Sequence, residues 1–240
     1  MNPVYRFQNV SFGYQAGQEV LSNLTLDLPP GITLVLGPNG AGKSTFLKLA
    51  AGVEHPDAGT IQVNGHELWQ EEVAARRELA YVPEQPDITP YASVGHVLEF
   101  VASLRGEPAS RVAELMQIFG IAEARGRSVR ELSKGQRHRV LLAAAHLGQP
   151  RVLLLDEPLS ALDQGLRKRV AAWVADMGSN GGSALVITHE LEPFADAAHR
   201  ALVFRDGNAE TVDPLPPPRP GRLEVLSRLA AGDAQGNATT

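Results

Sequence analysis

The chain has 240 residues, 22 of them basic and 27 acidic, and a formal net charge of −5. This length allows one large or two small domains with a substantial buried core, and the acidic balance argues against a nucleic-acid partner. The sequence contains no cysteine, which excludes disulfides, thiolate catalysis and cysteine-ligated metal sites. No apolar run is long enough to span a bilayer and residues 1–10 lack a secretion pattern, so we expect a soluble, intracellular protein.

The first third of the chain has the pattern of short strands. Alternating apolar runs in residues 4–28, broken by Gly13, Gly17 and the pair Pro29-Pro30, predict antiparallel strands. Residues 32–36 then predict a buried strand, and residues 45–50 predict the start of a helix. Residues 60–63, followed by the turn Asn64-Gly65, predict a second hairpin.

The pattern changes to helices between residues 94 and 148, where apolar side chains recur at helical spacing. Residues 151–155 and 184–187 are β-type apolar runs, and each is followed by a helical pattern. Such alternation predicts parallel strands joined by crossover helices. The fold class is therefore α/β, with an N-terminal antiparallel β subdomain and a helical subdomain inserted at about 86–149 that divides the domain into two lobes.

The last 28 residues differ in composition, so we place the main domain at 1–212 and a tail at 213–240. Five prolines in residues 214–220 predict an extended, solvated linker. Residues 221–231 predict a short helix with three leucines on one side, and residues 232–240 predict disorder. The alternative for residues 222–229 is a helix that docks a partner.

Residues 37–45 carry the strongest motif of the sequence, because they fit G-x-x-x-x-G-K-[ST], the phosphate-binding P-loop. Small residues let backbone N–H groups point at phosphates, and the helix that follows directs its N-terminus to the same place. Lys43 would reach the terminal phosphates and the Ser44 hydroxyl would hold Mg²⁺. The nine expected phosphate-binding residues are Gly37, Pro38, Asn39, Gly40, Ala41, Gly42, Lys43, Ser44 and Thr45. This motif predicts a P-loop NTPase core.

Two acids end the next strand-like run, Val152-Leu153-Leu154-Leu155-Asp156-Glu157. An acid at the end of a buried strand can bind the Mg²⁺ that bridges nucleotide phosphates, and a second acid beside it can polarise an attacking water. Alone, the pattern is typical of a core strand that ends in surface acids. After a P-loop in the same chain, the functional interpretation is favoured.

Three further segments complete a specific set. Leu132-Ser133-Lys134-Gly135-Gln136 lies between the P-loop and the acid strand, and Ser160-Ala161-Leu162-Asp163 and Thr188-His189 follow it. With these segments in this order, residues 4–212 resemble the ATP-binding subunits of ABC transporters. GTPases and kinases with a P-loop lack a signature like LSKGQ.

The resemblance implies a role for each matching residue. Tyr14 would stack on adenine, Asp156 would support Mg²⁺, and Glu157 would be the catalytic carboxylate, with Lys43 and the switch residue His189 at the γ-phosphate. The signature residues Ser133, Gly135 and Gln136 would close over ATP held by the P-loop of an opposite subunit, and Asp163 would communicate across that interface. The implied assembly is a head-to-tail dimer with two ATP molecules between its subunits, with a homodimer favoured.

Two positions depart from the family pattern. Lys134 replaces the usual glycine of the signature, so the backbone there must have a negative φ. In Tyr81-Val82-Pro83-Glu84-Gln85, Glu84 occupies the place of the family's glutamine, which meets Mg²⁺ and the membrane partner. We expect Glu84 to be the equivalent residue and a metal ligand, with Gln85 as the alternative. Glu84 resembles the branch of exporters whose membrane subunits are separate proteins, which favours export.

The leading hypothesis is therefore an ATPase that powers an ABC transporter, using ATP and Mg²⁺. It would bind separately encoded integral-membrane permease subunits and lie on the inner face of the cell membrane, on the cytoplasmic side. One alternative is a soluble ABC-type ATPase outside transport, such as an assembly or repair factor. Another is a nucleotide sensor without hydrolysis, which intact Lys43, Asp156, Glu157 and His189 disfavour.

Overall fold

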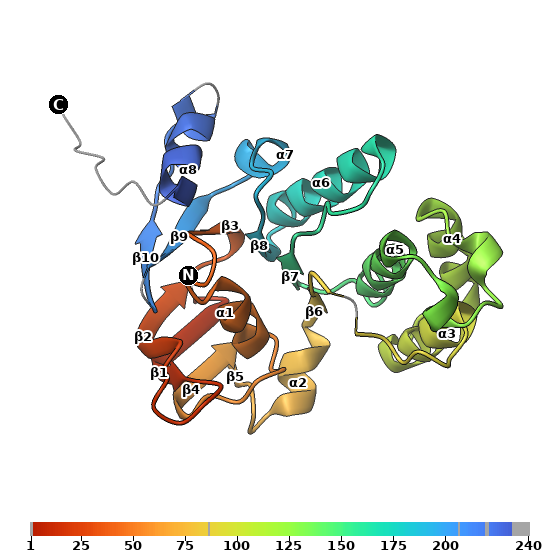
Figure 1. Cartoon of the computed structure of the whole chain (residues 1–240), viewed down its shortest axis with the longest axis horizontal. Helices are drawn as coiled ribbons and strands as arrows, with labels where there is room; N and C mark the ends of the chain where they lie inside the picture. The colour runs from red at the N-terminus through yellow and green to blue at the C-terminus, as the bar shows by residue number, and fades with distance from the viewer. Residues whose placement is uncertain (1, 86, 206, 219–220, 232–240) are drawn as a thin grey trace.

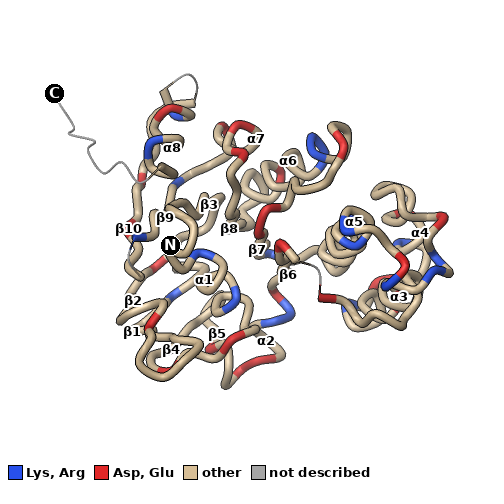
Figure 2. The backbone as a smooth tube through the Cα atoms, in the orientation of Figure 1, with Lys and Arg blue, Asp and Glu red and all other residues tan. Residues whose placement is uncertain are grey.

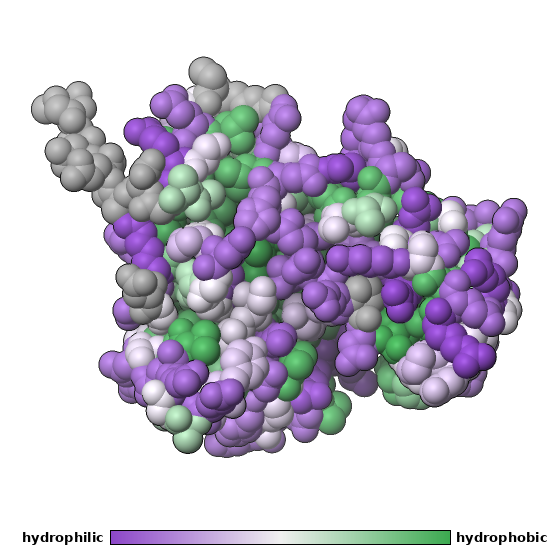
Figure 3. Space-filling view, viewed as in Figure 1, coloured by the Kyte–Doolittle hydropathy of each residue, from purple (hydrophilic) through white to green (hydrophobic). Residues whose placement is uncertain are grey.

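The computed structural model describes residues 2–85, 87–205, 207–218 and 221–231. The disorder predicted for residues 232–240 lies outside the described residues. Within those ranges no helix has both the length and the apolar character needed to cross a membrane. Figure 3 shows hydrophilic side chains over most of one face of the molecule, with smaller apolar areas between them.

The N-terminal part forms a four-stranded antiparallel sheet in the order β2-β1-β4-β5. Its strands are β1 (Tyr5–Phe12), β2 (Leu21–Leu28), β4 (Ala58–Val63) and β5 (His66–Glu67). Alternating side chains of β1 are buried, because one face of this sheet packs on the core while the other faces solvent. The expected antiparallel strands and the hairpin at Asn64-Gly65 are confirmed.

The second sheet has six strands in the order β10-β9-β3-β8-β7-β6. They are β3 (Gly31–Leu36), β6 (Leu79–Val82), β7 (Val152–Asp156), β8 (Ser183–Ile187), β9 (Arg200–Arg205) and β10 (Asn208–Val212). All neighbouring pairs are parallel except β9 and β10. Since every residue of β3, β7 and β8 is buried, these strands read as continuous apolar runs.

Helix α1 (Lys43–Ala50) lies between the two sheets (Figure 1). Its Phe46 side chain is fully buried, with ring centroids 4.9 Å from Phe7 of β1 and 5.1 Å from Phe204 of β9. The short helix α2 (Glu72–Arg77) follows β5. This packing fixes the start of α1 at the carboxyl end of β3.

The remaining helices pack on the other face of the six-stranded sheet or project from it. These are α3 (Val94–Arg105), α4 (Ala109–Ile118), α5 (Lys134–Ala145), α6 (Gln164–Ser179), α7 (Glu192–Ala195) and α8 (Gly221–Ala231), with 3₁₀ turns at Ala122–Ala124 and Val129–Glu131. Helices α3, α4 and α5 project to one side of the sheet (Figure 1), which gives the two expected lobes. They nevertheless share one apolar cluster with the sheet, which includes Leu98, Leu142 and Leu153.

The tail is folded onto the domain, and the interpretation of residues 214–220 as a solvated linker is wrong at Leu215. This side chain is 6% exposed, and Leu226 of α8 is fully buried in the same apolar cluster. Arg222 adds hydrogen bonds to the carbonyls of Pro216 and Ala198, at 2.6 and 2.9 Å. The apolar side of α8 therefore packs on its own domain, and a domain boundary at residue 212 stays a prediction.

Candidate functional site

The loop after β3 turns sharply because Gly37 has a φ of 132°. A Cβ atom at this position would lie 2.3 Å from the carbonyl oxygen of Phe204, so no larger residue fits without moving the backbone of β9. The loop then passes through Gly42, whose φ is 98°, into the first turn of α1 at Lys43. Glycine at both ends of this bend is what allows the strand to lead directly into the helix.

The N-terminus of α1 has its backbone donors available. Gly42 supplies no side-chain cap, and the first turn contains no acidic residue. Unpaired N–H groups at a helix N-terminus, together with the helix dipole, form a favourable environment for an anion. The loop therefore has the local geometry that phosphate binding requires.

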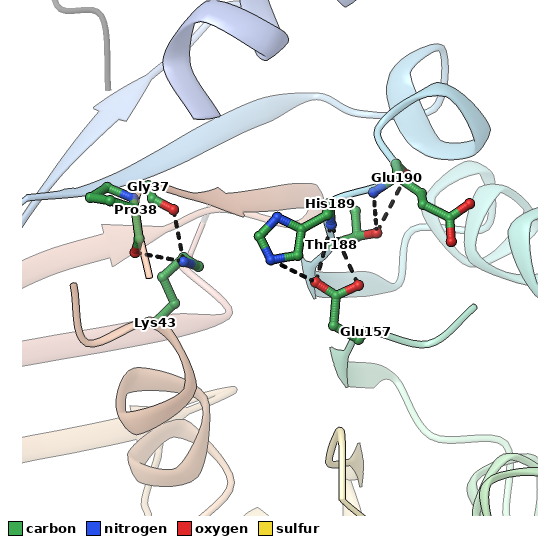
Figure 4. A network of polar contacts seen from close by, with 7 residues as sticks. All are labelled: Gly37, Pro38, Lys43, Glu157, Thr188, His189 and Glu190. Carbon is green, nitrogen blue, oxygen red and sulfur yellow. Dashed lines mark hydrogen bonds and ion pairs between the residues drawn. The ribbon is translucent and has the colours of Figure 1, made fainter. Parts of the chain in front are cut away.

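Lys43 spans the loop. Its Nζ atom donates hydrogen bonds to the carbonyl oxygens of Gly37 and Pro38, at 2.7 and 2.8 Å (Figure 4). Burial lowers the pKa of the ammonium group, while the charges of Asp156 and Glu157 oppose that change. The lysine thus places a positive charge between the loop and the two acids.

A cavity of about 540 Å³ opens where β3, β7 and β8 end. It is lined by Tyr14, Val20, Asn39, Gly40, Gly42, Lys43, Ser44, Thr45, Glu84, Asp156, Glu157, Ile187 and His189. Segments as far apart in the chain as Gly40 and His189 meet here because the carboxyl ends of parallel strands lie on the same edge of the sheet. Figure 2 shows acidic segments close to β6 and β7.

Glu157 and His189 face each other across the ends of β7 and β8. Asp156 pairs in register with Ile187, and the backbone N–H of Glu157 donates to the carbonyl of Ile187 at 2.9 Å. The backbone N–H of His189 donates to Oε1 of Glu157 at 3.1 Å, and the ring Nε2 lies 3.6 Å from the same oxygen (Figure 4). The carboxylate is therefore held by the loop that carries the histidine.

The two acids have shifted acid–base properties. Burial raises the pKa of Asp156 above its usual range, opposed by a hydrogen bond from Ser44. Burial also raises the pKa of Glu157, opposed by the neighbouring His189. The charge of Glu84 raises the pKa of both acids further, so three carboxylates share one cavity. A cation or a proton placed between them would relieve their repulsion.

The oxygen atoms of Ser44, Glu84 and Asp156 fit Mg²⁺ as a donor set, because this ion prefers hard oxygen ligands. In the described part of the chain, no group of three or more His, Cys, Asp or Glu side chains could hold a metal ion. Mg²⁺ typically binds through one or two carboxylates together with substrate phosphates. The site fits a metal that arrives with a phosphate ligand.

Tyr14 lies at the rim of the cavity and is 53% exposed. Its ring is packed edge-on against Phe12, with centroids 5.0 Å apart, and Nζ of Lys48 lies 5.3 Å from the ring centroid. Its hydroxyl is 3.4 Å from Oγ1 of Thr45. An exposed aromatic ring so close to the P-loop offers a face on which a planar base can stack.

The signature residues lie elsewhere and do not line this cavity. Ser133 caps α5 and accepts a hydrogen bond from the Gln136 backbone N–H at 3.2 Å, while Oε1 of the Gln136 side chain accepts one from the Ser133 backbone N–H at 3.1 Å. Lys134 begins the helix and is not among the described residues with a positive φ, as expected. Asp163 caps α6 in a similar way. The signature residues therefore form a capped helix N-terminus outside the cavity, and their role toward ATP stays a prediction.

Glu84, and not Gln85, lines the cavity. This observation supports the expected equivalence of Glu84 with the family's glutamine, and the role of Glu84 as a metal ligand stays a prediction. Sequence reasoning missed Val20 and Ile187, which also line the cavity. Val20 carries no motif, whereas Ile187 could have been found from its place directly before Thr188-His189.

A family model described as "ABC transporter" matches residues 21–160. The chain belongs to the ABC transporter family. It is 37% identical over 214 residues to the Fe(3+) ions import ATP-binding protein FbpC of Streptomyces coelicolor, covering 86% of this chain and 60% of that protein. It is 34% identical over 210 residues to the sulfate/thiosulfate import ATP-binding protein CysA of Gloeobacter violaceus, covering 85% and 60%. The chain thus spans about three-fifths of the length of these ABC relatives.

Solved structures of the family share the fold. An ATP-binding subunit of an ABC transporter aligns with a TM-score of 0.78 and 24% identity, over 88% of this chain and 90% of that one. A dimeric ATP-binding cassette in a post-hydrolysis state with ADP and Pi aligns with a TM-score of 0.75 and 22% identity, over 87% and 98%. The expected α/β fold with a P-loop NTPase core is confirmed.

Proposed function

We propose that this chain binds and hydrolyses ATP as the motor subunit of an ABC transporter. The observation that carries the proposal is the shared cavity: an open P-loop helix and the Glu157–His189 pair line the same space. The family membership and the names of the import relatives support it.

Each side chain has a task that its position supports. The loop amides and Lys43 bind the phosphates, and Tyr14 stacks on the base. Ser44, Asp156 and Glu84 would hold Mg²⁺, which neutralises phosphate charge when bound. Glu157 orients a water molecule and accepts its proton, and the raised pKa of its carboxyl makes it a better acceptor than a solvated glutamate. His189 holds this carboxylate through its backbone N–H and directs its ring to the same space.

The transport role requires partners. We propose a homodimer in which Ser133, Gly135 and Gln136 of one copy complete the ATP site of the other, with Asp163 at that interface. Membrane permease chains would use the resulting motion, with this subunit on the cytoplasmic side. Relatives named for import favour transport over a soluble assembly or repair ATPase. These relatives are importers, so export stays a prediction supported only by Glu84.

The Glu157→Gln variant tests the catalytic assignment. The amide keeps the size of the side chain but cannot accept a proton, so we expect phosphate release to fall about 100-fold or more while ATP still binds. Phosphate release and the Kd of a fluorescent ATP analogue measure the two steps separately. Glu210→Gln on β10, an exposed acid outside the cavity, is the matched control and should behave as wild type.

Turnover near the wild-type rate in the Glu157→Gln variant would remove Glu157 from the mechanism. Absence of phosphate release from the wild-type protein, with ATP still bound, would instead favour the nucleotide sensor.

A further inference from the structure

An ion pair joins the start of α6 to the loop that carries His189. Arg167 lies one turn into α6, and its guanidinium group contacts the carboxylate of Glu190, the residue directly after His189. Neither side chain belongs to the motifs identified in the sequence, and neither lines the ATP cavity. Figure 4 shows the Glu190 side chain extending away from Glu157, while its backbone N–H faces Thr188.

The Glu190 backbone is also tied to the switch loop. Its N–H donates to Oγ1 of Thr188 at 3.0 Å, and Oγ1 of Thr188 donates to the Glu190 carbonyl at 3.4 Å. His189 lies between these two residues and donates its own N–H to the Glu157 carboxylate at 3.1 Å. The position of the Glu190 carboxylate therefore affects a short loop that is held by internal hydrogen bonds and that in turn holds Glu157.

A second ion pair lies at the other end of the same helical turn. Arg139 of α5 donates to Oδ2 of Asp163 at 3.1 Å, and Oδ1 of Asp163 accepts from the Leu166 backbone at 3.0 Å. The backbone N–H of Arg167 donates to the Asp163 carbonyl at 3.0 Å. Helix α5, which is capped by the signature residue Ser133, is thus connected to the Glu157 site by a continuous series of polar contacts.

We propose that Arg167 and Glu190 are positioning residues that fix the His189 loop relative to the first turn of α6. Through this pair, the location of Asp163 and of the signature helix sets the orientation of His189 and Glu157. The inference rests on the proposed ATPase function, and it gives the two residues a role in turnover and not in nucleotide affinity. If a second copy displaced α5 or Asp163, this series of contacts would change the orientation of Glu157.

The pair contributes little to global stability. The Arg167 and Glu190 side chains are 33% and 46% exposed, and ion pairs at such sites are weak because water screens them. A fall in turnover without a fall in the unfolding temperature would therefore separate positioning from a general structural role.

Arg167→Gln and Glu190→Gln should each lower the kcat of ATP hydrolysis about three- to fivefold, with KM within about twofold of wild type. The exchange of both charges in Arg167→Glu/Glu190→Arg should recover most of the lost kcat, and Arg167→Glu alone should be the slowest variant. Lys168→Gln, which removes a positive charge from the next residue on α6, is the control and should leave kcat unchanged. Unchanged kcat in Arg167→Gln, or no recovery in the exchanged pair, would overturn the proposal.

Hydrogen exchange without nucleotide gives a readout independent of activity. The amide of His189 should exchange faster in Arg167→Gln than in wild type, because its acceptor Glu157 is then less well oriented, and the exchanged pair should restore protection. Equal exchange in wild type and Arg167→Gln would overturn the positioning role. If the wild-type chain does not hydrolyse ATP, the proposed function fails, whereas the exchange experiment still decides whether the pair holds the loop.

Discussion

At the scale of single residues, the site depends on strained backbone at a few positions. Glu157 has a φ of 49° and Ala161 a φ of 58°, both in the left-handed region that side chains other than glycine rarely adopt. Such conformations persist where the surroundings impose them, and they cluster at functional sites. Here the bond from the Glu157 N–H to Ile187 holds the first of these residues at the cavity.

Tyr14 provides a residue-scale prediction. Loss of the ring in Tyr14→Ala should weaken ATP binding about tenfold or more, because stacking of a base on an aromatic ring contributes about 1–3 kcal/mol. Tyr14→Phe keeps the ring and should bind within about twofold of wild type. Calorimetric titration with a non-hydrolysable ATP analogue measures both constants, and Tyr91→Ala, which removes an exposed ring outside the cavity, is the control. Equal affinity of Tyr14→Ala and wild type would exclude the stacking role.

At the scale of elements, α5 joins the signature to the core. Its Ser133 end is exposed to solvent, whereas its C-terminal His146 stacks on Trp173 of α6, with centroids 3.5 Å apart, and lies edge-on to Phe119. His138, in the middle of the helix, places its Nε2 3.0 Å from the carbonyl oxygen of Pro158, which follows Asp156 and Glu157. The helix is therefore anchored at its middle and at one end, whereas Ser133 at its N-terminus is exposed.

His146 makes this packing sensitive to acid. Burial lowers the pKa of His146 to about 4 in the folded protein, so between pH 6.5 and 4 the unfolded chain binds a proton that the folded chain does not. The free energy of unfolding therefore falls as the pH falls through this window, by up to about 1.4 kcal/mol per unit. His146→Phe should reduce the difference in stability between pH 7 and pH 4.5 by about 2 kcal/mol in urea unfolding.

The exposed His96, changed to Phe, is the control for this experiment and should keep the wild-type pH dependence. If His146→Phe also keeps the wild-type pH dependence of stability, protonation of His146 is not the cause of the lower stability in acid.

At the scale of the whole molecule, the helices that begin at the P-loop and at the signature, α1 and α5, lie in different lobes (Figure 1). The residues lining the P-loop cavity include none from the signature, so within one copy the cavity lacks the groups that the family resemblance assigns to it. In a head-to-tail dimer, each copy would supply these groups to the ATP site of the other copy.

ATP-dependent dimerisation tests this arrangement. With MgATP, Glu157→Gln should elute at twice the mass of one chain in size-exclusion chromatography with light scattering, because ATP is held and not hydrolysed. Adding Ser133→Glu should prevent the dimer, since a carboxylate at this helix N-terminus would repel the terminal phosphate. Ser110→Glu, an exposed serine in the first turn of α4, is the control. Dimers of equal stability in both double variants would contradict the role of Ser133.

The sequence by itself determined the local elements and the motifs. The apolar run of residues 32–36 predicts a strand and residues 45–50 predict a helix, and the glycines at positions 37 and 42 predict the bend between them, because glycine permits that backbone. Apolar periodicity likewise predicted the parallel strands and the helical insertion. The family could be recognised from the order of the motifs, because each motif is a short contiguous run that can be identified without the tertiary structure.

Only the tertiary structure decided which distant residues meet. The register between β7 and β8 brings the His189 backbone within hydrogen-bond distance of the Glu157 carboxylate, and the first turn of α6 brings Arg167 to Glu190. Proline content favoured a solvated tail, yet Leu215 and Leu226 are buried, because composition does not show that an apolar surface is available to receive them. Contacts between residues far apart in the chain depend on the assembled sheet, so no short pattern contains them.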